Sequence, residues 1–182
     1  MEERRPEAVI DFWFNALAPA QWFRKDPALD AQIARRFGDW LEAAGRGELW
    51  PWRASARGRL AEVIVLDQFS RHVHRGAPEA FERDPVALVL AQEAVAQRAD
   101  RLVDVTWRAF LYMPFMHSES LAIQDEGLRL FAQPGLEENL RQAHRHREVI
   151  RRFGRFPHRN AILGRATTRA ERGFLEQRGA TS

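Results

Sequence analysis

Four arginines, a histidine and an asparagine fall within the eleven residues from 150 to 160. Arginine binds carboxylate or phosphate through two parallel hydrogen bonds, and histidine and asparagine add directional ones. Gly154 can end the apolar-periodic helix that precedes it, and Pro157 keeps the residue before it out of the helical region. We therefore expect a loop that forms the positive wall of a pocket, although a solvated basic connection between two helices is the alternative. The loop residues expected to bind a ligand are Arg155, His158, Arg159 and Asn160.

A second group of polar residues lies upstream. Asp67 and Arg71 are four residues apart and share a helix face, at the edge of an apolar stripe where a carboxylate usually has a partner. A simple surface ion pair is the alternative. Pro114 is expected to interrupt a helix, so that a new helix begins at about His117 and its exposed amides attract anions. The upstream residues assigned to the same pocket are Asp67, Arg71, His117, Glu119 and Gln124.

These residues also permit an acid–base reaction, in which a histidine and a carboxylate lie within hydrogen-bond reach in an enclosed cleft. The candidate acids and bases are His117, His158, Asp67 and Glu119. A purely structural network is a further alternative, in which the two carboxylates neutralise the arginines of the loop. We predict that Asp67 or Glu119 contacts an arginine of segment 152–159 at a distance of ~4 Å or less.

Metal and cofactor chemistry is not indicated. The chain has no cysteine, which excludes disulfides, thiolate zinc sites and cysteine nucleophiles. Two histidine pairs, 72/74 and 144/146, are spaced by two residues, so on a helix their rings point roughly 200° apart and cannot hold one ion. The glycine-rich phosphate-binding motifs, the serine-nucleophile motif and the zinc-protease motif are absent. We expect no metal and no cofactor.

The positive charge is concentrated towards the C-terminus. Residues 141–182 hold 11 arginines and 3 glutamates, a balance of +8, whereas residues 1–140 hold 17 basic and 22 acidic side chains, a balance of −5. The pI of 10.4 mostly reflects the presence of only one lysine and one tyrosine, because few groups then titrate at alkaline pH. An RNA-binding protein that uses the arginine-rich lobe is a weaker alternative, and nucleic acid is not the partner we expect.

Hydrophobic periodicity predicts an all-α fold. Apolar residues recur at helical spacing, proline follows an N-cap aspartate at Asp26-Pro27 and Asp84-Pro85, and no useful stretch alternates with period two. Short connections favour stacked antiparallel helix pairs in a single domain over residues 1–182. The eight or nine helices expected cover residues 6–17, 27–45, 55–72, 79–81, 84–95, 105–113, 117–131, 136–153 and 168–177.

Neither export nor membrane insertion is expected. The first residues carry charge where a signal peptide needs an apolar run, and no apolar run approaches ~20 residues. We therefore expect a cytoplasmic protein without a membrane partner. The sequence does not indicate an oligomeric state.

Four blocks of sequence occur in order along nearly the whole chain: Asp-Phe-Trp-Phe at 11–14, Leu-Asp-Gln-Phe-Ser-Arg at 66–71, Phe-Leu-Tyr-Met-Pro-Phe-Met-His-Ser-Glu at 110–119, and Phe-Gly-Arg-Phe-Pro-His-Arg-Asn at 153–160. In these blocks the sequence resembles a widespread, mostly bacterial family catalogued only as a domain of unknown function. The resemblance implies an all-helical, tetratricopeptide-like fold, and it brings no established activity, cofactor or catalytic residue. The chain departs little from the pattern: Ser70 stands where proline is common, and Ser120 where an acidic residue is common.

We therefore predict a helical binding protein whose Arg/His-lined pocket takes an anionic small molecule or an acidic peptide end. The rival prediction is an enzyme that uses a histidine–carboxylate pair in the same pocket.

Overall fold

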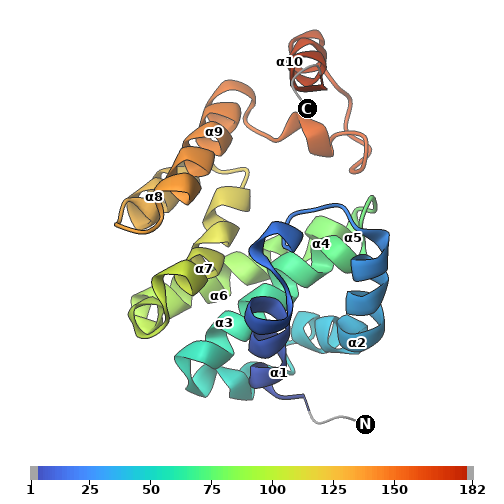
Figure 1. Ribbon diagram of the computed structural model, residues 1–182. Coiled ribbons are helices and arrows are strands. Elements are labelled where there is room, and N and C mark those ends of the chain that lie inside the picture. The colour runs from blue at the N-terminus through green and yellow to red at the C-terminus, as the bar shows by residue number, and fades with distance from the viewer. Residues whose placement is uncertain (1–3, 180–182) are drawn as a thin grey trace.

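The computed structural model describes residues 4–179, and every regular element within that range is helical (Figure 1). The prediction of an all-α fold is confirmed. The α-helical segments are α1 Pro6–Ile10, α2 Pro27–Gly45, α3 Ala56–Ile64, α4 Ser70–Val73, α5 Glu79–Glu82, α6 Asp84–Ala96, α7 Val105–His117, α8 Leu121–Phe131, α9 Glu137–Phe153 and α10 Arg169–Gly179. Shorter π-helical or 3₁₀ turns are η1 Asp11–Ala16, η2 Pro19–Gln21, η3 Trp50–Ala54, η4 Val65–Phe69, η5 Ala99–Leu102 and η6 Pro157–Arg159.

The two aspartate–proline pairs begin their helices differently. Asp26 caps α2 as predicted, because its Oδ1 accepts hydrogen bonds from the main-chain N–H groups of Ala28 at 3.0 Å and Leu29 at 3.3 Å. Asp84 was expected to do the same for α6. Instead, Asp84 is the first residue of that helix, no side chain caps the helix, and its carboxylate binds two arginines.

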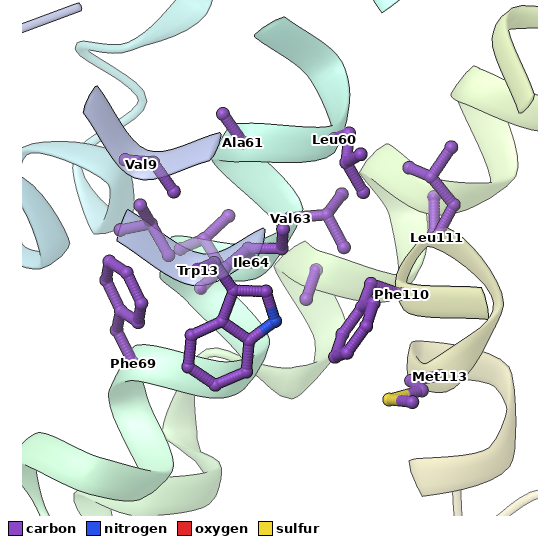
Figure 2. Packing of buried hydrophobic residues seen from close by; sticks show 14 of the residues in the cluster. Val9, Trp13, Leu60, Ala61, Val63, Ile64, Phe69, Phe110, Leu111 and Met113 are labelled. Atoms are coloured by element: carbon purple, nitrogen blue, oxygen red, sulfur yellow. The ribbon is translucent and has the colours of Figure 1, made fainter. Parts of the chain in front are cut away.

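The main core is centred on aromatic side chains around Trp13. Trp13 is fully buried and lies between Phe69 and Phe110 (Figure 2), with a ring-centroid separation of 5.7 Å in each pair. Tilted and edge-to-face contacts of this kind stabilise aromatic pairs beyond the area that they bury. Trp13 belongs to η1, Phe69 to η4 and Phe110 to α7. The cluster therefore fixes the N-terminal segment against the two elements that carry Asp67 and His117.

Asp67 lies in a π-helical turn. The run from Ala56 to Val73 is helical, as predicted for residues 55–72, but the part Val65–Phe69 has the wider π-helical geometry. Such turns are rare and often occur at functional sites. In this one two consecutive polar residues, Asp67 and Gln68, are both buried. A carboxylate and an amide inside the protein must find polar partners there.

The predicted helix break at Pro114 is wrong. α7 runs through Pro114 and ends at His117, and α8 begins only at Leu121. Proline removes one helical hydrogen bond, but all residues from 109 to 116 are buried, and their packing outweighs that loss. His117 is therefore the last residue of a helix rather than the first. The main-chain groups that lack a helical partner beside it are carbonyls, which attract cations instead of anions.

The C-terminal segment folds back from the end of α9 towards α4 and α5 (Figure 1). Gly154 ends α9 in the left-handed conformation, with φ 70°, which a residue without Cβ adopts readily. The predicted capping box of the last helix is confirmed. The N–H of Thr168 donates to Glu171 Oε2 at 2.8 Å, and the N–H of Glu171 donates to Thr168 Oγ1 at 3.2 Å.

Successive helices are neighbours in space, since α8 packs against both α7 and α9. The tetratricopeptide-like arrangement, the antiparallel pairing and the single domain remain predictions. Within residues 4–179, none of the helices has the length and apolar character needed to cross a membrane.

Candidate functional site

A pocket of about 610 Å³ lies between α5, the start of α6, the end of α7 and the C-terminal segment. Its polar lining residues are Glu79, Glu82, Asp84, His117, Ser118, Glu119 and Arg159. Its apolar wall consists of Pro78, Phe81, Pro85, Leu88, Pro114 and Leu163. A concave surface with an apolar wall and a few convergent polar groups is the usual form of a small-molecule site.

His117 and Asp67 form a hydrogen-bonded pair behind this pocket. Nδ1 of His117 lies 2.7 Å from Oδ1 of Asp67, although the two residues are fifty positions apart in the chain. Asp67 is only 1% exposed, whereas His117 lines the pocket. The second carboxylate oxygen, Oδ2, accepts a hydrogen bond from Gln68 Nε2 at 2.7 Å. Asp67 is therefore held from both sides and cannot turn away from the imidazole.

The ionisation state of Asp67 decides the orientation of the imidazole protons. Burial by itself raises the pKa of Asp67, but the charges of His117 and Arg71 outweigh burial and lower this pKa to about 2. An ionised carboxylate can only accept, so Nδ1 of His117 carries the hydrogen between the two groups. Nε2 has no hydrogen-bond partner among the described residues 4–179. Nε2 is therefore the ring nitrogen available to a ligand in the pocket.

Arg71 connects Asp67 to Asp84 at the start of α6. Its Nη1 donates to the main-chain oxygen of Asp67 at 2.8 Å and lies 3.3 Å from the Asp67 carboxylate. The same guanidinium binds Asp84 at two points, with distances of 2.7 Å and 3.0 Å. Two-point ion pairs of this kind fix geometry as well as charge. Arg71 thus holds the Asp67 turn at a set distance from the pocket wall that contains Asp84.

Arg159 brings a second guanidinium into the pocket, and its charge is incompletely compensated. Nη2 donates to the main-chain oxygen of His117 at 3.0 Å, and Nη1 lies 3.4 Å from Asp84 Oδ2. Nε is buried without a partner, and the guanidinium carbon lies 4.5 Å from the ring centre of Phe81 and 4.7 Å from that of Phe156. Burial lowers the pKa of Arg159 to about 10, because the lost hydration outweighs the attraction of Asp84. An anion beside this side chain would stabilise its charge.

Glu119, by contrast, is occupied by the C-terminal segment. Its Oε1 accepts the main-chain N–H of Phe156 at 2.7 Å, and its two oxygens bind Arg165 at 2.9 Å and 2.7 Å. Burial raises the pKa of Glu119, but the hydrogen bonds from Arg165 and Phe156 lower it overall. Glu119 therefore forms a closed contact that attaches the C-terminal segment to the end of α7.

The arrangement can bind and transfer a proton, but it offers little to a metal ion. Among the described residues, no three histidine, aspartate or glutamate side chains are grouped so that they could hold a metal. Asp67 and Asp84 are both taken up by arginines. Besides Ser118 and the acidic side chains of the lining, the imidazole and the Arg159 guanidinium are the polar groups that remain available to a ligand.

Comparison with known proteins places this chain in a family without assigning it a function. Residues 9–179 match the family described as bacterial protein of unknown function (DUF924). The chain belongs to this family. The resemblance inferred from the four sequence blocks is thereby confirmed.

A solved structure described as a protein of unknown function, ATU0120, from Agrobacterium tumefaciens, is similar along almost its whole length. It shares 41% sequence identity and a TM-score of 0.90 with this chain, and the match covers 94% of this chain and 97% of the other. No match was found among curated proteins.

The structure brings together five of the residues that the sequence assigned to one site. His117, Glu119 and Arg159 line the pocket, and Asp67 and Arg71 lie directly behind it. Gln124 is buried on α8 and has a supporting role. Its Nε2 donates to the main-chain oxygens of Met116 and Ser118 at 2.7 Å and 2.8 Å, which caps the end of α7 and so positions His117.

The other three assigned residues point elsewhere. Arg155 and Asn160 bind Glu171 of α10: the guanidinium makes contacts at 2.8 Å and 3.0 Å, and the amide nitrogen makes one at 3.3 Å. His158 lines a different hollow, on the α9 side of the segment. The loop contains the 3₁₀ turn Pro157–Arg159, so neighbouring side chains point in different directions. Of the four assigned loop residues, only Arg159 reaches the pocket.

The predicted ion pair between Asp67 or Glu119 and an arginine of segment 152–159 is wrong. Asp67 pairs with Arg71, four residues away on its own helical run, and Glu119 pairs with Arg165, beyond the predicted segment. The convergence predicted through such an ion pair is therefore wrong, and the blocks meet through main-chain groups instead: Glu119 accepts from the N–H of Phe156, and Arg159 donates to the oxygen of His117. Because the partners are main-chain groups, the charges of the side chains do not predict these contacts.

Sequence reasoning missed two charged residues at the site, Asp84 and Arg165. The sequence predicts only a helix cap at Asp84, yet its carboxylate lies between Arg71 and Arg159. Arg165 follows Gly164, which adopts φ 64° and turns the chain back towards Glu119. That glycine was the one available signal, because a residue with positive φ marks a reversal of direction.

Proposed function

We propose that the pocket is the active site of an enzyme in which His117 transfers a proton and Arg159 binds an anionic group of a small substrate. The observation that carries this proposal is the 2.7 Å hydrogen bond between His117 Nδ1 and the buried carboxylate of Asp67. A histidine oriented in this way by a buried carboxylate, with its other nitrogen facing a pocket, has the arrangement of a general acid–base.

The proton transfer follows from the orientation of the ring. With Nδ1–H donating to Asp67, Nε2 of the neutral ring holds a lone pair and accepts a proton from a bound hydroxyl or water. The imidazolium that forms is stabilised by the ionised Asp67 and can return the proton from Nε2 to a leaving group. Asp67 orients the ring and remains ionised throughout, since its pKa is lowered to about 2.

Arg159 supports an anionic substrate. A guanidinium has five N–H donors, and in Arg159 only two of them are used among the described residues, in the hydrogen bond to His117 and the longer contact to Asp84. A carboxylate or phosphate in the pocket would engage donors that are otherwise unused, near the nitrogen that transfers the proton. This matches the anionic small molecule or acidic peptide end expected from the sequence, with Arg159 in place of the wider loop.

Activity measurements on a variant of His117 test the proposal. The substrates are a panel of esters and amides that carry a free carboxylate or phosphate. His117→Asn keeps a donor for Asp67 but cannot accept a proton, so it should lower the turnover of any active compound by about 10²–10⁴-fold. The control is His144→Asn, an exposed histidine on α9 outside this pocket. Equal turnover in the wild type and in His117→Asn would rule out acid–base catalysis by this residue.

Anion binding without catalysis is the second candidate function, and the buried, incompletely paired Arg159 specifically favours it. Phosphate and succinate should raise the melting temperature of the wild-type protein, because they bind only the folded state. Arg159→Lys keeps the charge but loses the planar fork, and it should reduce this shift. A shift that disappears in Arg159→Lys, together with turnover that His117→Asn leaves unchanged, would establish a binding protein.

A further inference from the structure

A second hollow, of about 560 Å³, lies between α9 and the segment that leads into α10. We call it the α9–α10 groove. It lies on the other side of the C-terminal segment from the proposed active site, and the two hollows share no lining residue. Its lining combines charged and apolar side chains in a way that indicates a particular kind of partner.

The unpaired charge of the groove is positive. His144 and Arg145 line it, and neither has a hydrogen bond or an ion pair within 4.0 Å among the described residues. Glu148 is the carboxylate that lines the groove, and it is already bound by Arg151 at 2.6 Å and 2.7 Å. His158 lines the same groove from the opposite segment. An incoming carboxylate would therefore meet a guanidinium without an ion pair and imidazole side chains that can donate hydrogen bonds.

Most other arginines of α9 have a carboxylate partner, unlike Arg145. Arg141 is paired with Glu138, Arg147 with Asp125 and Arg151 with Glu148. Arg145 lies among them on the same helix, and its charge acts on Glu138, which Arg141 already binds. Arg152 also has no ion pair among the described residues, but it packs over aromatic rings, so Arg145 is the arginine of α9 that lines the groove without a partner. If the charges of α9 served only solubility, there would be no reason for the arginine that lines the groove to lack a carboxylate partner.

The apolar part of the lining indicates more than a free anion. Val149 and Phe174 are partly buried, and Phe156 is almost fully buried at the base with 2% exposure. These residues lie outside the main core cluster. Arg152 packs over the rings of Phe153 and Phe174, which supports that wall of the groove from behind. Inorganic phosphate would leave this apolar surface uncovered, whereas a peptide segment with an apolar side chain would cover it.

We propose that the α9–α10 groove docks an acidic segment of a partner protein, in which carboxylates meet Arg145 and the histidines and an apolar side chain packs against Val149 and Phe174. Charge complementarity selects this occupant. RNA is the less suitable alternative, because most of the surrounding arginines are already paired and the aromatic rings of the groove pack against their own chain.

Fluorescence anisotropy with a short labelled peptide of alternating glutamate and leucine tests this. The full chain should bind the peptide saturably below about 1 mM, and added salt should weaken the binding. A peptide with lysine in place of glutamate should not bind. Arg145→Ala and Phe174→Ala should each weaken binding about tenfold or more. Arg145 is exposed and makes no hydrogen bond or ion pair among the described residues, so its variant should fold normally, as circular dichroism would show. The matched control is Arg141→Ala on the same helix, which should leave binding unchanged.

Three results would overturn the proposal. The first is the absence of saturable binding by the glutamate–leucine peptide up to about 1 mM. The second is equal loss of binding in Arg141→Ala and Arg145→Ala, which would indicate a diffuse effect of charge. The third is tight binding of oligouridylate that Arg145→Ala weakens while the peptide does not bind, which would assign the groove to RNA. None of these results involves His117 or Arg159, so none of them bears on the proposed active site.

Discussion

Arg71 and Asp84 form a two-point ion pair, with 2.7 Å between Nη1 and Oδ1 and 3.0 Å between Nη2 and Oδ2. The same Nη1 also donates to the main-chain oxygen of Asp67 at 2.8 Å. One guanidinium therefore joins the first residue of α6 to the π-helical turn that contains Asp67, the carboxylate that orients His117. Arg71 therefore helps to set the placement of Asp67 relative to the pocket wall.

Replacement of Arg71 should be strongly destabilising. Arg71→Met keeps the length of the side chain but leaves the carboxylates of Asp67 and Asp84 without their shared cation. Removal of one partner from a buried ion pair costs about 3–5 kcal/mol, and we expect a loss near the lower end because Asp84 keeps its contact with Arg159. Urea unfolding measures the free energy. As control, Arg151→Ala removes an exposed pair on α9 and should cost less than about 0.5 kcal/mol.

Acid should destabilise the protein partly through Asp67. The pKa of this group is lowered to about 2 in the folded state, from a value of 3.8 without the fold. A lowered pKa means that the unfolded chain binds the proton more tightly. The stabilisation is therefore complete above about pH 4 and is lost as the pH falls from 4 towards 2. The slope of unfolding free energy against pH in this window should contain up to about 1.4 kcal/mol per pH unit from Asp67.

Asp67→Asn isolates this contribution. The variant should be less stable than the wild type at pH 7 and should show a shallower loss of stability between pH 4 and 2. The loss should not vanish, because the pKa of Glu171 is also lowered to about 2, by its hydrogen bonds from Arg155 and Thr168. Identical slopes for wild type and Asp67→Asn would show that the carboxylate does not titrate in this range.

The helical architecture was predictable because it depends on local patterns. The spacing of apolar residues and the cap-plus-proline start at Asp26 act within a few residues of each other, so the sequence displays them directly. Pro114 was misjudged because its local penalty is offset by the burial of the whole surrounding run, which is a property of the tertiary structure. That single error also reversed the expected polarity of the helix end at His117.

The site was predictable in composition but not in its pairings. The residue types at Asp67, His117 and Arg159 indicated a polar cluster, and the structure brings all three to one pocket. Which arginine binds which carboxylate depends on distances between distant segments. Asp84 could not be selected from its neighbours in the sequence, since an aspartate before a proline also suits a helix cap.

Two glycines in helices should respond to alanine in opposite ways. A Cβ on Gly58 of α3 would lie 1.9 Å from the main-chain oxygen of Trp52, so Gly58→Ala requires the turn before α3 to move. We expect Gly58→Ala to lower the free energy of unfolding by at least about 1–3 kcal/mol. A Cβ on Gly38 of α2 would meet no atom within 4 Å, so Gly38→Ala should stabilise by about 0.5–1 kcal/mol through helix propensity. Thermal and urea unfolding measure both, and destabilisation by both variants would contradict the geometry.

Arg155 should prove to be a structural residue rather than a ligand-binding one. Its guanidinium binds Glu171 at two points and the main-chain oxygen of Ala166 at 2.7 Å, which closes the C-terminal segment on itself. Arg155→Ala should therefore speed hydrogen exchange of the amides between 154 and 177, and Glu171→Gln should do the same. The increase in melting temperature with phosphate or succinate should persist in both variants, because Arg159 remains in place. If Arg155→Ala instead abolished the anion effect and left hydrogen exchange unchanged, Arg155 would be the ligand-binding arginine that the sequence alone suggested.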